Sequence, residues 1–397
     1  MSDLVLYDDE RARHFEPFSL MRPAGELRAG ALLIRERWER VAGRPASAFV
    51  GAPHLTDFEE PGAPSSTAII PAGTLLVNAR FAPDITDVLG DAPSYTARGR
   101  LTAIRLTGSI EASELRSGHV SLEELSRVAG ESIEQRGWWV DDIWHLVRDL
   151  GQMLASDIPA LGAGVRVLRP DEAAIIGTHA VFVDEGATIE PHACFDVRLG
   201  PVLIRRGATV QAFTRVVGPC CVGEEALVTS DRVSGCSIGP HCNVHGEISA
   251  TVLLGYANKG HDGFVGHSYL GRWVNLGAGT TTSNLKNTYG SVAMWTPDGV
   301  RDTGMQFLGT LFGDHAKTGI NLALTTGSVI GAGASVVGRM PPKVVPPFAW
   351  GEHEQLATYR LDKFVEVAER VMARRSMTLG ARARRQLAAS YGARWGA

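Results

Sequence analysis

The side chains that could do chemistry gather in one stretch, residues 260–285. It reads GHDGFVGHSYLGRWVNLGAGTTTSNL. Its histidine, His267, could take a proton near neutral pH, because a neutral imidazole titrates close to that range. The Gly277-Ala278-Gly279 segment has almost no side chain, so a ligand could approach its backbone amides closely. The stretch also carries three neutral side chains that donate and accept hydrogen bonds, namely Tyr269, Asn275 and Asn284.

The elements that must position these residues follow a six-residue period. Such a period is neither helical nor that of a simple alternating strand. It is typical of a parallel β-helix, in which every sixth side chain points into a narrow core. His267 lies off this register, so we expect its side chain to point outward. The apolar positions that keep the step are Val183 and Ile189; Ile204, Val210, Val216, Val222 and Val228; Ile238 and Val244; Phe264, Leu270 and Leu276; and Phe312, Thr318, Leu324, Ile330 and Val336.

Two segments depart from this period. Residues 285–307 break the register, so we expect them to loop out of the β-helix, and an excursion of that length is more often functional than idle. A proline-rich stretch at 341–347 ends the coil. We therefore predict a β-helix over 165–348 and a helical, basic tail over 352–397. The basic residues of the tail are either a solvated helix face or a contact for phosphate, a partner that guanidinium groups favour.

Residues 1–160 have the pattern of an α/β domain, with strands alternating with helices. We expect strands at 4–7, 67–71, 74–81 and 101–107. One amphipathic helix is expected from Glu26 to about Gly43, and a second over 138–155. Ser121 and Glu124 have the spacing of a capping box at the start of a further helix.

Composition excludes several classes of function. The 397 residues carry a net charge of −4 with 44% hydrophobic residues, so there is no reason to expect nucleic acid as a partner. No apolar run is long enough to span a membrane, and the first residues, MSDLVLYDDE, are acidic where a signal peptide is basic. The five cysteines lack the paired spacing of a zinc site, so we predict no metal ligands among them and a reduced, cytoplasmic protein.

The motif in residues 260–285 resembles a known family. Together with LGTLFGDHAKTGINLAL at 308–324, it is similar to the acetyltransferase half of the bifunctional N-acetylglucosamine-1-phosphate uridyltransferase/glucosamine-1-phosphate N-acetyltransferase family. The resemblance covers residues from about 175 to 345. It implies a left-handed β-helix and a homotrimer, with the substrate held between neighbouring subunits.

The resemblance also implies a reaction and roles for residues. The reaction is coenzyme A-dependent N-acetylation of an amino-sugar phosphate or a nucleotide-linked amino sugar, with acetyl-CoA as co-substrate. His267 would be the general base and Asn284 would position the amine, while Tyr269 and Asn275 would hold sugar hydroxyls. The amides of Gly277, Ala278 and Gly279 would approach the thioester of coenzyme A. Ser249 stands where the family has a phosphate-binding lysine, so Lys259 or Arg215 would substitute for it.

The first 160 residues resemble a divergent sugar nucleotidyltransferase domain through PFSLMRPAGELRAG at 17–30. Working members have a glycine-rich phosphate loop followed by a lysine, whereas this chain has YDDERARHFEP at 7–17, without glycine, and Ala24-Gly25-Glu26 in place of the lysine. We therefore expect nucleotidyl transfer to be lost or reduced to binding. Two alternatives to the acetyltransferase stay open. One is a sugar-1-phosphate nucleotidyltransferase using UTP or dTTP with Mg²⁺, in which the β-helix serves only for trimerisation. The other is a non-catalytic sugar-phosphate sensor or scaffold.

Overall fold

The computed structural model describes residues 3–126, 132–229, 231–352 and 355–395. These residues form two compact units. The N-terminal unit combines residues up to Ile143 with those from Ser376 onward, and the β-helix unit runs from Trp144 to Arg375. The first and the last described residues therefore belong to the same unit. The predicted boundaries at 160, 165, 348 and 352 stay a prediction.

A mixed sheet of seven described strands forms the centre of the N-terminal unit, in the order β12-β9-β10-β7-β1-β4-β5. Strand β1 (Leu4–Tyr7) is central, with β4 (Ala48–Val50) and β7 (Leu75–Asn78) parallel on either side. All four residues of β1 are buried, as expected of an uninterrupted apolar run in the middle of a covered sheet. The unit's other elements are α1 (Glu10–Arg13), η1 (Ala24–Glu26), β2 (Arg28–Ala29), β3 (Leu32–Leu33), α2 (Ile34–Ala42), η2 (Pro53–Leu55), β5 (Ser65–Ser66), β6 (Ile69–Ile70), β8 (Phe81–Pro83), β9 (Ser94–Ala97), β10 (Arg100–Arg105), β11 (Ile110–Glu111), α3 (Ala112–Leu115), α4 (Leu122–Leu125), β12 (Ser132–Glu134), β13 (Gly137–Trp139) and α8 (Ala381–Trp395).

The two long helices expected in this region are shorter than predicted. The first, α2, does end at Gly43, whose φ of 64° is the left-handed conformation that stops a helix. Its predicted first turns instead form the β2–β3 hairpin. The expected helix over 138–155 begins as strand β13, because Trp138 and Trp139 pair with β8, and only then continues as α5 (His145–Arg148) and α6 (Leu150–Leu161). The predicted capping box of Ser121 and Glu124 is confirmed at α4.

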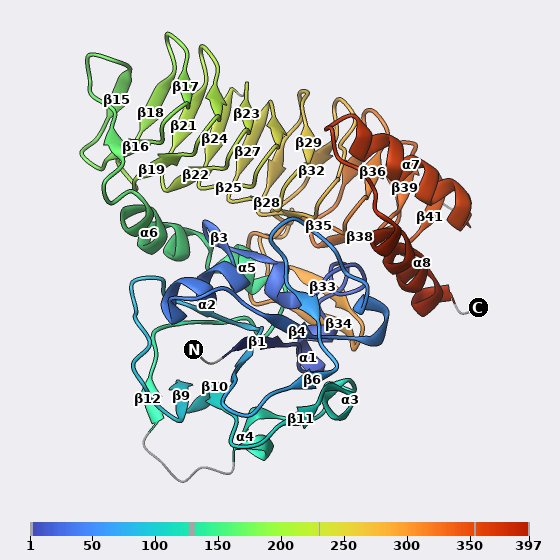
Figure 1. The fold of residues 1–397 in the computed structure, drawn as a ribbon. Helices are drawn as coiled ribbons and strands as arrows, with labels where there is room; N and C mark the ends of the chain where they lie inside the picture. The colour runs from blue at the N-terminus through green and yellow to red at the C-terminus, as the bar shows by residue number, and fades with distance from the viewer. Residues whose placement is uncertain (1–2, 127–131, 230, 353–354, 396–397) are drawn as a thin grey trace. The chain divides into compact units, whose positions relative to one another are not determined.

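Three stacked sheets build the left-handed parallel β-helix of the second unit, as Figure 1 shows. Face 1 has the order β14-β16-β19-β22-β25-β28-β31-β35-β38-β40 and face 2 has β15-β18-β21-β24-β27-β30. Face 3 runs from β17 through β20, β23, β26 and β29, then through the bridged residues Asn258, Asn275 and Lys317 to β36, β39, β41 and β42. The pair β32 and β37 is separate.

The bounds of the face 1 strands are β14 (Arg166–Val167), β16 (Val181–Val183), β19 (Val202–Ile204), β22 (Cys220–Val222), β25 (Ser237–Ile238), β28 (Val252–Leu253), β31 (Tyr269–Leu270), β35 (Thr310–Phe312), β38 (Ser328–Ile330) and β40 (Val344–Val345). Those of face 2 are β15 (Ala174–Ile176), β18 (Cys194–Asp196), β21 (Arg215–Val217), β24 (Arg232–Ser234), β27 (Glu247–Ser249) and β30 (Val265–Gly266). Those of face 3 and of the separate pair are β17 (Thr188–Ile189), β20 (Thr209–Val210), β23 (Leu227–Val228), β26 (Asn243–Val244), β29 (Asn258–Lys259), β36 (Lys317–Thr318), β39 (Ser335–Val337), β41 (Ala349–Glu352), β42 (Gln355–Thr358), β32 (Thr281–Thr282) and β37 (Ala323–Leu324).

The predicted six-residue register matches the core of this β-helix. Leu270, Leu276 and Phe312 are each at most 1% exposed in one continuous apolar cluster. Phe264 is the exception, because Val265 takes the inward position and Phe264 is only half-buried. Strand β30 begins at Val265, which pairs with Ile248 of the coil below.

The predicted excursion at 285–307 is confirmed. An antiparallel bridge between Leu285 and Phe307 closes its neck. Beyond the neck, β33 (Ala293–Thr296) and β34 (Gly299–Asp302) form a hairpin. Val292 and Met294 are fully buried, so the hairpin packs rather than hanging free in solvent.

The last coil is followed by helix α7 (Leu361–Ala373), which lies along β36 and β39 in Figure 1. Phe364 anchors this helix on the β-helix by edge-to-face contacts with His315 and Phe348, at 5.8 and 5.2 Å between ring centroids. Strands β41 and β42 precede it, so the predicted helical tail begins with a strand pair. None of the helices in the described part of the chain is both long and apolar enough to cross a membrane.

Candidate functional site

His267 lies at the corner where the chain turns from face 2 to face 1, between β30 and β31. Its backbone has a φ of 48°, a conformation uncommon for residues other than glycine. The coil holds it there, because its N–H donates to the carbonyl of Ser249 and its own carbonyl accepts from the N–H of Gly309, both at 2.9 Å. The side chain is half-buried and lies outside the core cluster. The position is therefore rigid and faces away from the core.

Two side chains fix the imidazole of His267. Nδ2 of Asn284, from the next coil, lies 2.9 Å from Nδ1 of His267. The ring of Phe307 stacks on the imidazole, with centroids 5.3 Å apart and planes 26° apart. Asn284 stands where the excursion leaves the β-helix, and Phe307 stands where it returns. We call His267, Asn284 and Phe307 the His267 corner.

Glycines make this close arrangement possible. A Cβ on Gly309 would lie 2.1 Å from the carbonyl oxygen of Gly266, and one on Gly266 would lie 2.7 Å from Nδ2 of Asn284. Both positions therefore exclude any larger residue without a shift of backbone or carboxamide. Sequence reasoning missed Phe307 and Gly309. The signal that could have found them was their place at the end of the 285–307 excursion.

Burial lowers the pKa of His267 below its ordinary value of 6.5, so the ring is neutral at neutral pH. The Asn284 carboxamide decides which nitrogen carries the proton. If Nδ2 donates to Nδ1, the proton sits on Nε2. If the carboxamide turns by 180°, its oxygen accepts from Nδ1–H instead, and Nε2 then has a free lone pair. Only this second arrangement makes His267 a base toward solvent.

The structure does not bring the Gly277–Gly279 segment to the His267 corner within one chain. The segment lies at the opposite end of β32 from Asn284. Its amides are also engaged, since the N–H of Gly277 donates to Thr318 and that of Gly279 donates to Asp262, at 3.1 and 3.0 Å. Gly277 and Gly279 therefore have no free N–H that could bind a thioester carbonyl, the role predicted for them.

Two of the predicted substrate contacts are buried. Tyr269 is fully buried in β31, a position that does not suit contact with a sugar. Lys259 is 1% exposed and pairs in register with Val244, a core position. Its Nζ donates to the carbonyls of His245, at 2.9 Å, and His261, and burial lowers its pKa to about 8. This amine therefore serves the coil and does not suit a sugar phosphate.

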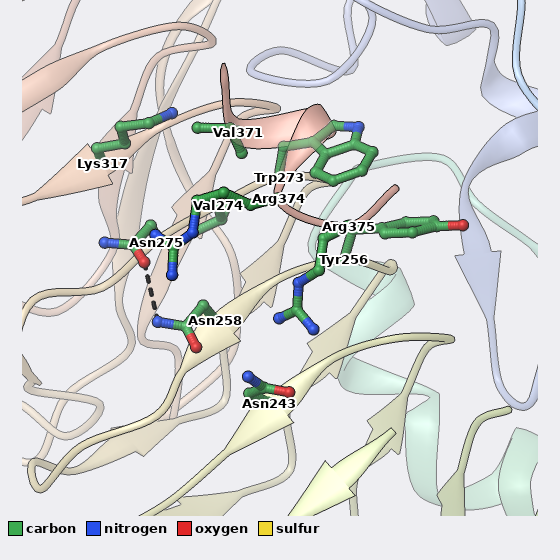
Figure 2. A pocket seen from close by; sticks show the side chains of 10 residues that line it. All are labelled: Asn243, Tyr256, Asn258, Trp273, Val274, Asn275, Lys317, Val371, Arg374 and Arg375. Atoms are coloured by element: carbon green, nitrogen blue, oxygen red, sulfur yellow. Dashed lines mark hydrogen bonds between the residues drawn. The ribbon is translucent and has the colours of Figure 1, made fainter. Parts of the chain in front are cut away.

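The other two predicted contacts are accessible but lie away from the corner. Arg215 is on β21, which β24 and β27 separate from β30 in face 2, and it forms an ion pair with Asp196 at 2.6 Å. Asn275 lies on face 3, where it lines a cavity of about 380 Å³ shown in Figure 2. That cavity also contains Lys317 and Arg375, which sequence reasoning did not connect with a site.

The carboxyl end of β1 in the N-terminal unit carries the two acidic residues of the missing glycine loop. Asp9 caps the short helix α1 and accepts from Arg80 at 2.7 Å and from Asn78 at 2.9 Å. Asp8 accepts from the N–H of Ala24, and burial raises its pKa to about 7. Both carboxylates are thus held by the unit's own residues. Across the described ranges, His, Cys, Asp and Glu side chains nowhere gather in a group of three that could hold a metal ion.

Comparison with known proteins finds relatives among sugar-phosphate transferases. A family model described as sugar nucleotidyl transferase matches residues 4–166. The bifunctional protein GlmU of Desulfitobacterium hafniense is 29% identical over 196 residues, which cover 42% of this chain and 39% of that protein. A bifunctional sugar-1-phosphate nucleotidylyltransferase/acetyltransferase of Sulfurisphaera tokodaii is 32% identical over 90 residues, which cover 23% of this chain and 22% of that protein. The chain thus aligns with less than half the length of these curated relatives.

Among solved structures, a mutant of AntD, an N-acyltransferase from Bacillus cereus in complex with dTDP and coenzyme A, is similar at 12% identity. The match covers 52% of this chain and 91% of that one, with a TM-score of 0.22.

Proposed function

The chain fits a GlmU-like family, in which a sugar nucleotidyl transferase domain precedes a β-helix, and from this premise we propose that it is a coenzyme A-dependent N-acyltransferase. The acyl donor is acetyl-CoA, bound as a co-substrate. The acceptor is an amino-sugar phosphate or a nucleotide-linked amino sugar. The observation that carries the proposal is the His267 corner, where a neutral imidazole is held by a carboxamide and an aromatic ring.

The chemistry follows from the free nitrogen of that ring. With Nδ1 donating to the Asn284 oxygen, Nε2 takes the proton that the sugar amine loses as its lone pair attacks the thioester carbonyl carbon. Collapse of the intermediate breaks the C–S bond, and the imidazolium returns its proton to the departing thiolate. Phe307 covers one face of the imidazole, so the acceptor approaches Nε2 along the open edge. The coil on which His267 stands supplies the rigidity that positioning requires.

A homotrimer completes the proposal. Within one chain the Gly277–Gly279 segment and Asn275 lie away from His267, so a site that uses all of them takes parts from two neighbouring subunits. Exposed apolar side chains on face 3, such as Val337 of β39 and Trp350 of β41, support such packing. Light scattering at micromolar concentration tests this assembly. A monomer would remove the shared site and leave only the His267 corner.

The experiment that tests the function is the His267→Ala variant. Because the side chain lies outside the core, we expect the melting temperature and the binding of acetyl-CoA to change little. Turnover of acetyl-CoA with an amino-sugar phosphate should fall by roughly 10²–10⁴-fold, the usual contribution of one general base. Turnover close to that of the wild type on the best acceptor would refute the proposed role of His267.

Nucleotidyl transfer by the N-terminal unit is the second candidate, and the match of residues 4–166 to a sugar nucleotidyl transferase model favours it. Against it, Arg80 and Asn78 already bind Asp9, and α1 stands where working members have a glycine loop. We expect no pyrophosphate above background when the protein is incubated with UTP or dTTP, Mg²⁺ and a sugar 1-phosphate. Rapid pyrophosphate release would show instead that Asp8 and Asp9 build an unfamiliar nucleotide site.

A further inference from the structure

Phe264 stands where an outward-facing row of face 2 changes its character. The preceding places of this row, on successive coils, are charged and exposed: Arg215, Arg232 and Glu247. Phe264 takes the next place, because Val265 beside it pairs with Ile248 of the coil below. Its side chain is half-buried, whereas the charged side chains of the row are exposed. An aromatic ring therefore replaces a charged group on the coil that carries His267.

Gly266 leaves room for this ring. Since side chains alternate along a strand, Phe264 and Gly266 point to the same side of the chain. A Cβ on Gly266 would lie 2.8 Å from Cε1 of Phe264 and still closer to its Cζ, so the far edge of the ring lies over the glycine. The same Cβ would lie 2.7 Å from Nδ2 of Asn284. The ring edge and the Asn284 carboxamide are therefore neighbours above Gly266.

Hydrogen bonds to Thr282 hold this segment in place. The N–H of Thr282 donates to the carbonyl of Phe264 at 2.8 Å, and the N–H of Gly266 donates to the hydroxyl oxygen of Thr282 at 3.2 Å. Thr282 is only 1% exposed and stands two residues before Asn284 on the next coil. The ring and the carboxamide thus belong to two coils that are bonded to each other, so their contact does not depend on a flexible loop.

One atom of the Asn284 carboxamide faces two neighbours. The atom at the Nδ2 position lies 2.9 Å from Nδ1 of His267 and also lies beside the ring edge of Phe264. The two orientations of a carboxamide have nearly the same shape, so local charge rather than packing chooses between them. The edge of an aromatic ring carries partial positive charge, which favours an oxygen over an NH₂ group at this place. In the described part of the chain no other hydrogen bond engages this carboxamide.

We propose that Phe264 is a positioning residue that sets the tautomer of His267. Its ring edge keeps the oxygen of Asn284 toward the imidazole, this oxygen accepts from Nδ1–H, and Nε2 keeps its lone pair for the acceptor amine. The inference rests on the proposed function, because it concerns how His267 becomes a base. The tautomer itself can be measured without turnover, so the two can fail separately.

The test is ¹⁵N NMR of the full-length protein with labelled histidine, at about pH 8.5, where a histidine near its ordinary pKa is neutral. The imidazole shifts distinguish Nδ1–H from Nε2–H, and the signals of His267 are those lost in His267→Gln. The wild type should carry mainly Nδ1–H. Phe264→Leu keeps an apolar side chain but removes the ring edge, so the ratio of Nδ1–H to Nε2–H should fall about two- to fivefold, the size of one weak C–H···O contact. In the same variant kcat for acetyl transfer should fall in proportion to the Nδ1–H fraction, with the KM for acetyl-CoA unchanged.

Two controls separate this role from a general loss of packing. Phe213→Leu makes the same change at an exposed ring of the same β-helix and should leave the tautomer ratio of His267 unchanged. In Asn284→Asp both side-chain atoms that can face the imidazole are oxygens, so the ring edge has no orientation left to choose. Adding Phe264→Leu to Asn284→Asp should therefore have no further effect on the ratio, a non-additivity that is typical of residues acting through one contact.

Each outcome has a defined meaning. Equal ratios in the wild type and Phe264→Leu would overturn the role of Phe264, and so would a wild type that carries the proton mainly on Nε2. An effect of Phe264→Leu in the Asn284→Asp background as large as in the wild type would show that the ring acts through packing alone, which also overturns the proposal. If the wild type showed no acetyl transfer, the proposed function would fail, and the tautomer ratios would still decide the role of Phe264.

Discussion

Asn284→Asp is the substitution that tests the His267 corner most directly. It keeps the shape of the side chain but places a carboxylate where a carboxamide now lies 2.9 Å from Nδ1 of His267. Burial alone lowers the pKa of His267 in the wild type, and no charged neighbour contributes to that shift. A carboxylate at this distance favours the imidazolium and therefore raises the pKa of the ring.

The size of the shift follows from the geometry. Unit charges about 4 Å apart attract by about 4 kcal/mol at an effective dielectric constant of about 20, which equals about three pKa units. His267 is half-buried, so solvent screens part of this attraction, and we expect a rise of about one to two units. An upward shift of the pKa leaves a smaller fraction of the His267 rings neutral at pH 7. The rate at pH 7 should therefore fall, while the high-pH plateau persists.

The assay is the pH dependence of kcat/KM for acetyl transfer, measured from pH 5 to 9.5 with both substrates. In the wild type the rate should rise through an apparent pKa below 6.5, and in Asn284→Asp the same limb should move upward. Asn284→Leu is the control, because it has a similar volume and no charge. This variant should lower the high-pH plateau of kcat/KM without moving the rise of kcat/KM to higher pH. A limb in Asn284→Asp within about 0.3 units of the wild type would refute the assignment of His267 as the base held by residue 284.

Two further predictions concern burial. Phe307→Ala uncovers the imidazole of His267, so kcat should fall by about tenfold and the apparent pKa of the pH–rate profile should move back toward 6.5. The control is Phe213→Ala, which removes an exposed ring stacked on His192 at 5.2 Å and should change neither quantity. Equal effects of the two variants in the same pH–rate assay would contradict the role of Phe307. The pKa of Lys259 is about 8 in the folded chain and 10.5 in the unfolded one. Between these pH values the unfolded chain binds more protons, so the free energy of unfolding of the wild type rises with pH. Relative to Lys259→Met the rise should reach up to about 3 kcal/mol. Urea denaturation of both proteins from pH 8 to 10.5 measures this, and a constant difference would mean that water solvates the ammonium group.

The β-helix could be predicted from the sequence because its core repeats a local rule. Each inward side chain is set by its place in the coil, so Ile204, Val210 and Leu270 could be assigned without knowledge of distant contacts. The rule fails where residues are inserted at a corner. Residues 260–263 lengthen the turn before β30, and the period alone does not say whether Phe264 or Val265 then faces inward.

The candidate site could be predicted only in part, for a related physical reason. Asn284 follows His267 by seventeen residues, about one coil, so their proximity is a consequence of stacking. Phe307 reaches the same corner only through the path of the excursion, which no short-range pattern encodes. Whether the amide of Gly277 is free or bonded depends on its partner Thr318, which lies in another coil. The sequence identified residue types suited to chemistry, but it did not show which of their polar groups are already engaged in hydrogen bonds within the fold.

The state of those polar groups also separates the two candidate activities. Nucleotidyl transfer needs backbone amides free for phosphates and carboxylates free for a metal ion, but Asp9 is bound by Arg80 and Asn78, and Asp8 is buried with a raised pKa. Acyl transfer needs a neutral base held at a fixed place with one nitrogen available. His267 meets that need when the Asn284 oxygen accepts from Nδ1–H, because burial keeps the ring neutral and no hydrogen bond in the described part of the chain engages Nε2. At the His267 corner the fold leaves a neutral base available, whereas at the end of β1 the two carboxylates are already bound or buried. We therefore assign the chemistry to the β-helix.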